Sequence, residues 1–270
     1  MLQGVAVLQD GRPVAAAAPT SRVESLVGPV IAMLRVREGR TMPLDKARVA
    51  PLADRVIAAG LANEPGAMAA VARDLRLEGL PLDDLTDLVI PEAARELGRA
   101  WEDDRLSFVE VTLAMTRIQR LLRDALFDVP QDGSGPSVLF ALPEGEQHTL
   151  GGLVAVRQLR RMGCSACLAI GEKPHKVLDL LHLRRFDAMF VTVASIENLE
   201  LARDLVAIVR DGYARALPVA VGGAVLCGTD QAAAERIRER TGAAIVTNDL
   251  AVALSALNLT PQRESRAETA

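Results

Sequence analysis

The sequence predicts an α/β fold in which a four-helix bundle is followed by a doubly wound, five-stranded parallel sheet. Between residues 44 and 127, apolar side chains recur at the spacing of amphipathic helices joined by short connections. After residue 136, five short apolar runs alternate with five amphipathic segments. Such β–α repeats build a parallel sheet with right-handed crossovers. A Pro- and Gly-containing segment, residues 130–136, separates the two patterns and is typical of a linker.

The composition agrees with this fold and limits the function. Half of the residues are apolar, but only five Phe, one Trp and one Tyr occur, which suits closely packed helices and parallel strands. The formal net charge of -4 argues against nucleic-acid binding driven by bulk charge, so we expect direct DNA contact to be absent or secondary. The odd number of cysteines and the lack of a signal peptide or of a run of about 18 apolar residues predict a cytoplasmic protein without a membrane span.

The predicted domain boundaries follow the changes in pattern. They define an N-terminal extension at 1–42, a helical-bundle cap at 43–128, a linker at 129–136, a Rossmann-like domain at 137–258 and a disordered polar tail at 259–270. In the bundle, Asp45 is expected to cap a helix ending near Leu61, and a second helix is expected to end near Leu77. A third opens at Leu82 with Pro91 as a kink, and a fourth begins near Ser107.

The second domain is predicted in the same way, from short apolar runs and the amphipathic segments between them. The expected strands are 137–142, 165–170, 188–194, 218–221 and 243–247. The expected helices are 150–162, 174–183, 198–211, 230–240 and 249–257.

The turn after the first strand carries the strongest candidate for chemistry. In doubly wound sheets, ligands bind beyond the carboxyl ends of the strands near the first strand. His148 lies there, where its imidazole can ligate a metal from below. Glu146 can accept a hydrogen bond from the other ring nitrogen, which fixes the tautomer. Gly151 and Gly152 lack side chains, so a flat macrocycle can approach the backbone.

Glu146-x-His148-x-x-Gly151 resembles the Asp-x-His-x-x-Gly signature of cobalamin-binding domains. In that family a Ser-x-Leu element and then a Gly-Gly pair follow on later strands. Here Thr192-Val193-Ala194 and Gly222-Gly223 stand at these places. There are 40 residues between Gly151 and Thr192, and 27 between Ala194 and Gly222. The resemblance implies a flavodoxin-like strand order and a cobalamin whose cobalt is bound by His148. It also implies that Thr149, Gly151, Gly152 and the two later elements line the cofactor and the slot for its benzimidazole tail.

The helical half carries a second resemblance. Pro91, Leu97-Gly98 and Trp101 resemble the bundle that precedes the cobalamin domain in methionine synthase and B12-dependent photoreceptors. That likeness implies that Trp101 covers the upper face of the corrin. The pattern from Leu97 through Arg123, together with the stretch from Gly145 to Gly151, is most similar to the AerR/PpaA family. The likeness implies a transcriptional antirepressor, not an enzyme, that binds cobalamin and acts on a repressor of the CrtJ/PpsR type.

Two other functions use the same scaffold. A corrinoid carrier for a methyltransferase also holds its cofactor through a histidine under a helical cap, and a haem-binding redox sensor is a second alternative. Other candidate motifs are weaker. Cys164 and Cys167 should point to opposite faces of the second strand, and His175 and His182 suit a solvated helix face.

Overall fold

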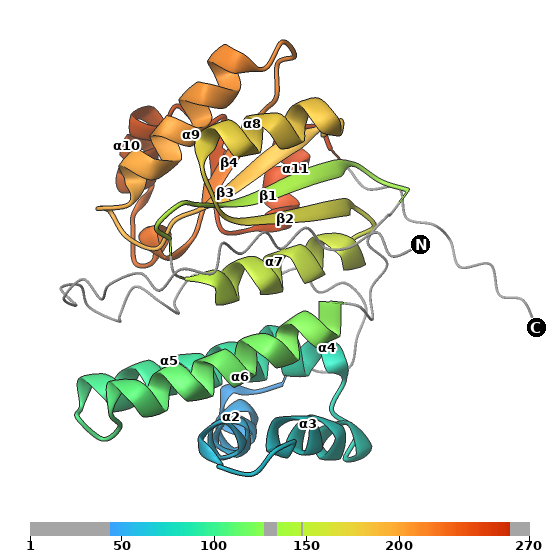
Figure 1. The fold of residues 1–270 in the computed structure, drawn as a ribbon, viewed down its shortest axis with the longest axis vertical. Coiled ribbons are helices and arrows are strands. Elements are labelled where there is room, and N and C mark those ends of the chain that lie inside the picture. The colour runs from blue at the N-terminus through green and yellow to red at the C-terminus, as the bar shows by residue number, and fades with distance from the viewer. Residues whose placement is uncertain (1–43, 127–133, 147, 260–270) are drawn as a thin grey trace, which may run out of the picture.

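A computed structural model describes residues 44–126, 134–146 and 148–259, and places a helical bundle beneath an α/β domain (Figure 1). The predicted extension at 1–42, most of the linker and the tail beyond residue 259 lie outside the described residues. In the bundle, α2 (Lys46–Leu61), α3 (Ala67–Leu77) and α6 (Phe108–Leu126) agree with the predicted helices. No helix within the described ranges combines the length and the apolar character needed to cross a bilayer.

The third predicted helix is continuous but not regular. It runs from α4 (Leu82–Asp84) through a π-helical turn, η2 (Leu85–Val89), into α5 (Ile90–Glu102). Pro91 lies directly after this turn, and proline has no N–H to donate to the preceding turn of an α-helix. The disturbance expected at Pro91 therefore takes the form of a wider turn just before the proline.

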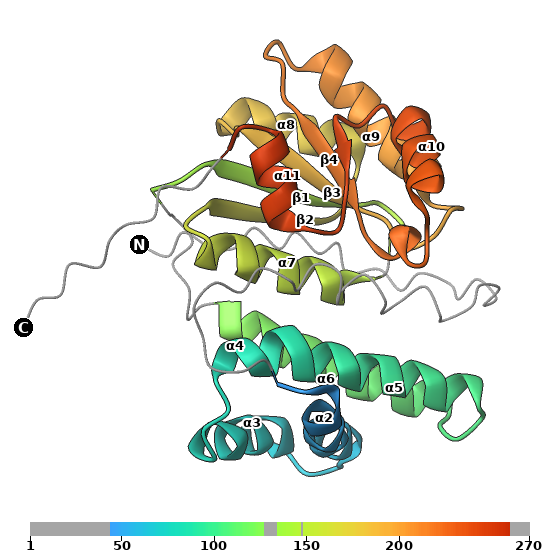
Figure 2. The ribbon, with the colours of Figure 1, turned by 180° about the vertical axis from the view of Figure 1, so that it is seen from behind.

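The α/β domain has a five-stranded, wholly parallel sheet in the predicted order β2-β1-β3-β4-β5. The strands are β1 (Ser137–Pro143), β2 (Ser165–Glu172), β3 (Ala188–Thr192), β4 (Val219–Gly222) and β5 (Ile245–Val246). The helices are α7 (Thr149–Arg161), α8 (Pro174–Leu183), α9 (Leu199–Gly212), α10 (Gln231–Thr241) and α11 (Leu250–Ala256), with a short η3 (Ala224–Leu226) after β4. Figures 1 and 2 show α7 and α11 on one face of the sheet and α8, α9 and α10 on the other.

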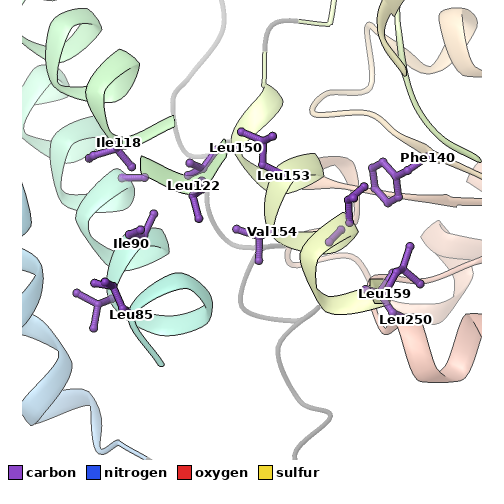
Figure 3. Packing of buried hydrophobic residues seen from close by; sticks show 14 of the residues in the cluster. Leu85, Ile90, Ile118, Leu122, Phe140, Leu150, Leu153, Val154, Leu159 and Leu250 are labelled. Carbon is purple, nitrogen blue, oxygen red and sulfur yellow. The ribbon is translucent and has the colours of Figure 1, made fainter. Parts of the chain in front are cut away.

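A single hydrophobic core joins the bundle to one face of the sheet through α7. Ile118 and Leu122 of α6 lie toward Leu150 and Val154 of α7, and the opposite side of α7 packs on Phe140 of β1 (Figure 3). A separate core lies between the other face and helices α8 to α10. Because α7 is packed on both sides, the bundle and the sheet share one continuous interior.

Ion pairs add a polar contact between α7 and the bundle. Arg157, whose side chain is 3% exposed, donates from Nη1 to Asp83 Oδ1 at 2.9 Å. Arg161 contacts Asp83 Oδ2 at 3.1 Å and Asp87 Oδ2 at 2.6 Å. A guanidinium this deeply buried depends on its carboxylate, because an uncompensated buried charge is strongly destabilising.

Replacing Asp83 with Ala should therefore lower the free energy of unfolding by about 2–3 kcal/mol. This value lies between the loss expected for a fully buried ion pair and that for a surface pair, because Arg157 is buried and Asp83 is partly exposed. Urea denaturation measures this change. The control is Asp211→Ala, which breaks the pair with Arg210 where both side chains are 67% exposed, and this variant should lose less than about 1 kcal/mol. Equal losses in the two variants would contradict a stabilising role for the contact between α7 and the bundle.

Candidate functional site

The turn that follows β1 brings Glu146 and His148 to the carboxyl edge of the sheet. Glu146 N–H donates to Pro143 O at 3.0 Å and closes a tight turn. Gly145 within it has a φ of 91°, which is a conformation that favours glycine. His148 then stands immediately before the first residue of α7, as its N-cap. The histidine is thus placed by a short turn between two buried elements.

The Glu146 carboxylate is buried and accepts four hydrogen bonds. Its Oε1 is 2.5 Å from His148 Nδ1 and accepts the His148 backbone N–H at 3.0 Å. Its Oε2 accepts the Ala194 backbone N–H at 2.8 Å and Asn198 Nδ2 at 3.1 Å. One side chain therefore links the β1 turn to the segment after β3, and the predicted pairing of Glu146 with His148 is present.

These contacts hold the carboxylate in its ionised form. Burial by itself raises the pKa of Glu146, but hydrogen bonds and charge from His148, together with the Ala194 and His148 N–H groups, outweigh burial and lower the pKa to about 2. Since an ionised carboxylate only accepts hydrogen bonds, Nδ1 of His148 must carry the proton in this pair. The tautomer of the ring is thereby fixed.

The second ring nitrogen of His148 is available to a ligand. The His148 side chain is 35% exposed, whereas that of Glu146 is 0% exposed. Within the described part of the chain, nothing hydrogen-bonds to Nε2. An Nε2 without a protein partner, on a partly exposed ring whose Nδ1 is held by a carboxylate, is the arrangement found in metal-binding histidines.

The ends of β3 and β4 lie beside each other, as the motif spacing predicted. Thr192 pairs with Gly222 in the ladder, and Val193 N–H donates to Gly222 O at 3.0 Å. Thr192 is buried, and its hydroxyl has no hydrogen-bond partner among residues 44–126, 134–146 and 148–259. Ala194 is buried beside Glu146, so the Glu146-x-His148 turn and the two later elements converge on one edge of the sheet.

Gly223 is glycine for a reason that the sequence did not indicate. Its φ is 113°, and an added Cβ would lie 2.2 Å from Val193 O and 2.6 Å from Thr192 Oγ1. The missing side chain lets the two chain segments approach, and this packing role stands beside the predicted role of Gly223 in lining the slot for a cofactor tail. A larger residue at position 223 tests folding as well as binding.

Two asparagines complete the site, and sequence reasoning missed both. Asn248, which follows β5, is buried and holds the backbone of Gly223 from both sides: Oδ1 accepts its N–H at 2.7 Å and Nδ2 donates to its carbonyl at 3.2 Å. Asn198 donates to Glu146. The weak signal available was that each asparagine closely follows a predicted strand.

The first turn of α7 places the remaining motif residues. Thr149 and Gly151 are half-buried at its amino end. Gly152 is buried, and a Cβ there would lie 2.7 Å from Leu142 Cδ1. Glycine at 152 thus allows the close packing of α7 on β1, and its role in the approach of a macrocycle stays a prediction.

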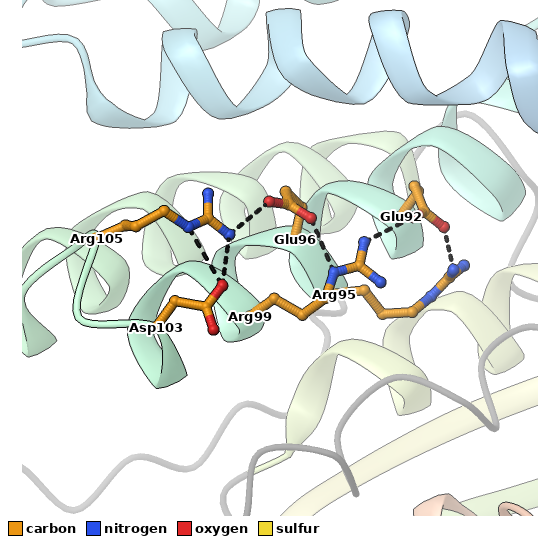
Figure 4. Close-up of polar contacts among 6 residues, drawn as sticks. All are labelled: Glu92, Arg95, Glu96, Arg99, Asp103 and Arg105. Carbon is orange, nitrogen blue, oxygen red and sulfur yellow. Dashed lines mark hydrogen bonds and ion pairs between the residues drawn. The ribbon is translucent and has the colours of Figure 1, made fainter.

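Trp101, the predicted cover of the cofactor, lies in the last turn of α5, far in the sequence from Glu146 and His148. It is half-buried, and its ring lies 6.3 Å from that of Phe108 at the start of α6. Figures 1 and 2 show the α5–α6 connection extending past the amino end of α7, on the side where the β1 turn lies. A network of ion pairs on α5 fixes this connection (Figure 4). Its members are Glu92, Arg95, Glu96, Arg99, Asp103 and Arg105.

The weaker candidates stay apart from the site. Cys164 is buried in the core that includes α7, whereas Cys167 packs against the core on the opposite face of the sheet, and both thiols are free. His175 and His182 are exposed on α8. Among the residues that the structure describes, no cluster of three His, Cys, Asp or Glu side chains is arranged to hold a metal ion.

Comparison with known proteins gives a family and a fold. No family model matches the chain. An uncharacterised 20.5 kDa protein encoded in the bchF–crtJ intergenic region of Rhodobacter capsulatus is 36% identical over 190 residues, which cover 69% of this chain and 96% of that protein. The chain belongs to the family of this protein. Its fold is shared with the monomethylamine corrinoid protein of Methanosarcina barkeri, with a TM-score of 0.57, 16% identity and coverage of 77% of this chain and 96% of the other.

The pKa of Glu146 predicts a specific pH dependence of stability. Its pKa is about 2 when folded and near 4.5 when free, so the carboxylate contributes about 3 kcal/mol that is fully present above pH 4.5 and is lost as the pH falls through 2. Glu146→Gln should be less stable at pH 7, and its deficit relative to wild type should shrink between pH 5 and pH 3. Urea unfolding at these pH values measures the deficit.

Glu144 provides the control, since its side chain is 55% exposed on the same turn. Glu144→Gln should differ little from wild type at every pH. A deficit of Glu146→Gln that stays constant from pH 7 to pH 3 would show that the ionised carboxylate is not what the site depends on.

Proposed function

We propose that this protein is a cobalamin-binding transcriptional antirepressor of the AerR/PpaA type. It acts in the cytoplasm through contact with a CrtJ/PpsR-type repressor and is not an enzyme. The observation that carries the proposal is the Glu146–His148 pair, whose free Nε2 projects from the carboxyl edge of a sheet with the fold of a corrinoid protein. The gene of the Rhodobacter capsulatus relative lies beside crtJ, which supports a link to that repressor.

The residues present fit a corrinoid. His148 would hold its cobalt, because the ring offers a nitrogen that no described side chain uses. The unbonded Thr192 hydroxyl lies next to Gly223, whose backbone is held by two hydrogen bonds from Asn248. Thr149 and Gly151, at the amino end of α7, would lie against the macrocycle. When bound, cobalamin would supply a cobalt with an upper ligand that can change with light or redox state.

Ligation by His148 has a direct spectroscopic test. His148→Ala should abolish the change in the absorption spectrum that hydroxocobalamin undergoes on binding, and should weaken its retention on gel filtration, because the axial nitrogen donor is gone. His175→Ala and His182→Ala remove exposed imidazoles from α8 and should behave as wild type. An unchanged spectrum in His148→Ala would refute ligation by this residue, and a spectral shift with haemin alone would favour the haem alternative.

The regulatory role is tested with the repressor bound to a fluorescent operator duplex. Cobalamin-loaded protein should lower the anisotropy by releasing DNA, and the cofactor-free protein should do so less. Trp101→Ala should make release independent of cobalamin, because this ring is expected to lie between corrin and bundle, while Trp101→Phe should restore the dependence.

A corrinoid carrier is the second candidate, favoured by the fold shared with the monomethylamine corrinoid protein. The two functions make opposite predictions. If the protein leaves repressor–operator complexes intact and its cobalamin accepts a methyl group from a methyltransferase, the carrier function replaces the regulatory one.

A further inference from the structure

A groove crosses the outer side of the bundle where α3 meets α6. One hollow of about 440 Å³ lies between the connection at 63–66, the start of α3 and the middle of α6. A second, of about 570 Å³, lies between the rest of α3, Leu82 and the end of α6. Ala69, Leu121 and Asp124 line both hollows, so the two form one surface. We refer to it as the α3–α6 groove.

The floor of the groove has the size and character that a helix requires. Ala69, Ala72 and Ala125 are small, and with Leu121 they form an apolar floor between two helices. At one end Leu77 is 80% exposed, which leaves a large apolar side chain beside the groove. The 11 residues of α3 span about 16 Å, the length of three turns of a docked helix. An amphipathic helix would bury this floor with residues spaced three and four apart.

The rim carries an excess of positive charge although the whole chain is negative. Its charged residues are Arg73, Arg76, Arg117 and Arg120 against Glu64 and Asp124. Arg117 is held by the carbonyls of Gly60 and Ala62, at 2.6 and 2.5 Å. The guanidinium groups of Arg76 and Arg120 have no ion pair or hydrogen bond within the described residues. Two unengaged guanidiniums beside an apolar floor favour a partner with acidic flanks.

The groove and the cofactor site use different sides of the bundle. α6 packs on α7 through Ile118 and Leu122, whereas Arg120, Leu121 and Asp124 face the groove. Figures 1 and 2 show α3 on the side of the bundle away from α7. A partner in the groove therefore leaves the His148 edge open, and α6, which also packs on α7, connects the groove to the helix that follows His148.

We propose that the α3–α6 groove binds an acidic amphipathic helix of about three turns on another protein. The assignment of that helix to the repressor rests on the proposed function. The chemistry of the expected ligand does not rest on the proposed function, because it follows from the apolar floor, the exposed Leu77 and the unpaired guanidinium groups.

The chemistry is tested with two synthetic helical peptides of about 15 residues, each long enough to span the groove. Both carry Leu at spacings of three and four, with Glu at the flanks in one and Lys in the other. The Glu peptide, labelled for anisotropy, should bind the wild-type protein. Ala69→Phe, which fills the floor, and the pair Arg76→Glu/Arg120→Glu should each weaken binding by about tenfold or more, or ~1.4 kcal/mol.

The matched control is Arg215→Glu/Arg236→Glu, which makes the same change in net charge at two exposed arginines of the α/β domain. It should bind the Glu peptide within about twofold of wild type, a few tenths of a kcal/mol. All variants should keep the wild-type thermal melt and hydroxocobalamin spectrum. Binding of the Lys peptide equal to that of the Glu peptide, no binding of the Glu peptide, or groove variants that bind as wild type would each overturn the proposal.

The same variants identify the partner. If wild type binds the repressor and the groove variants lose this binding, the groove is the repressor site. If wild type binds the repressor and the groove variants bind equally, the proposal is overturned and the proposed function stands. If wild type binds the Glu peptide but no repressor, the proposed function is wrong and the helix-binding role of the groove stands. If wild type binds duplex DNA and Arg76→Glu/Arg120→Glu does not, the proposal is overturned in favour of a phosphate-binding surface. If wild type forms a dimer in sedimentation and Ala69→Phe does not, it is overturned in favour of a self-association surface.

Discussion

The structure depends on the burial of α7 between the bundle and the sheet. Ten of its residues are buried, from Leu150 to Arg160, and they include Arg157, Gln158 and Arg160 as well as apolar side chains. One side of this helix completes the core of the bundle and the other covers β1, so neither half has a finished interior without it. His148 is the N-cap of the same helix. The position of the candidate ligand is therefore fixed by the most constrained element of the fold, and rigid elements hold functional groups more accurately than loops do.

Much of this arrangement could be predicted from the sequence, because it depends on local periodicity. The change from helical spacing to short apolar runs agrees with the end of α6 at Leu126 and the start of β1 at Ser137, and β1 and β2 were predicted to within two residues of their ends. The third strand was predicted to reach residue 194 but ends at Thr192. Val193 and Ala194 are buried although they lie outside the strand, and their apolar character made them resemble strand residues in the sequence. The spacing of Glu146 and His148 also predicted their hydrogen bond, because two residues of one turn meet in almost any closed conformation.

The features that could not be predicted are set by contacts distant in the sequence. Arg157 and Asp83 lie 74 residues apart, and nothing in either segment indicates the other. Asn248 holds Gly223 across 25 residues, and the tight contact that requires glycine at 223 comes from the Val193 backbone. The α3–α6 groove is formed by residues of two helices that lie far apart in the sequence, whereas each helix on its own shows an ordinary amphipathic pattern. Local patterns therefore predicted the Glu146–His148 contact, and tertiary packing determined the residues that surround it.

The shared helices also define how a cofactor at His148 can influence a partner on the bundle. A ligand shifts an equilibrium only if it binds two arrangements with different affinity, so regulation of this kind would require two positions of the bundle against α7. The contact between them is apolar at Leu150 and Val154 and ionic at Asp83, where the carboxylate is 26% exposed. Apolar packing tolerates sliding better than a paired, buried guanidinium does, because breaking the pair leaves a charge without compensation. Motion of the bundle is then expected to pivot near the Arg157–Asp83 pair, with the largest displacement at the end of α5 that carries Trp101, on the side where the His148 edge lies.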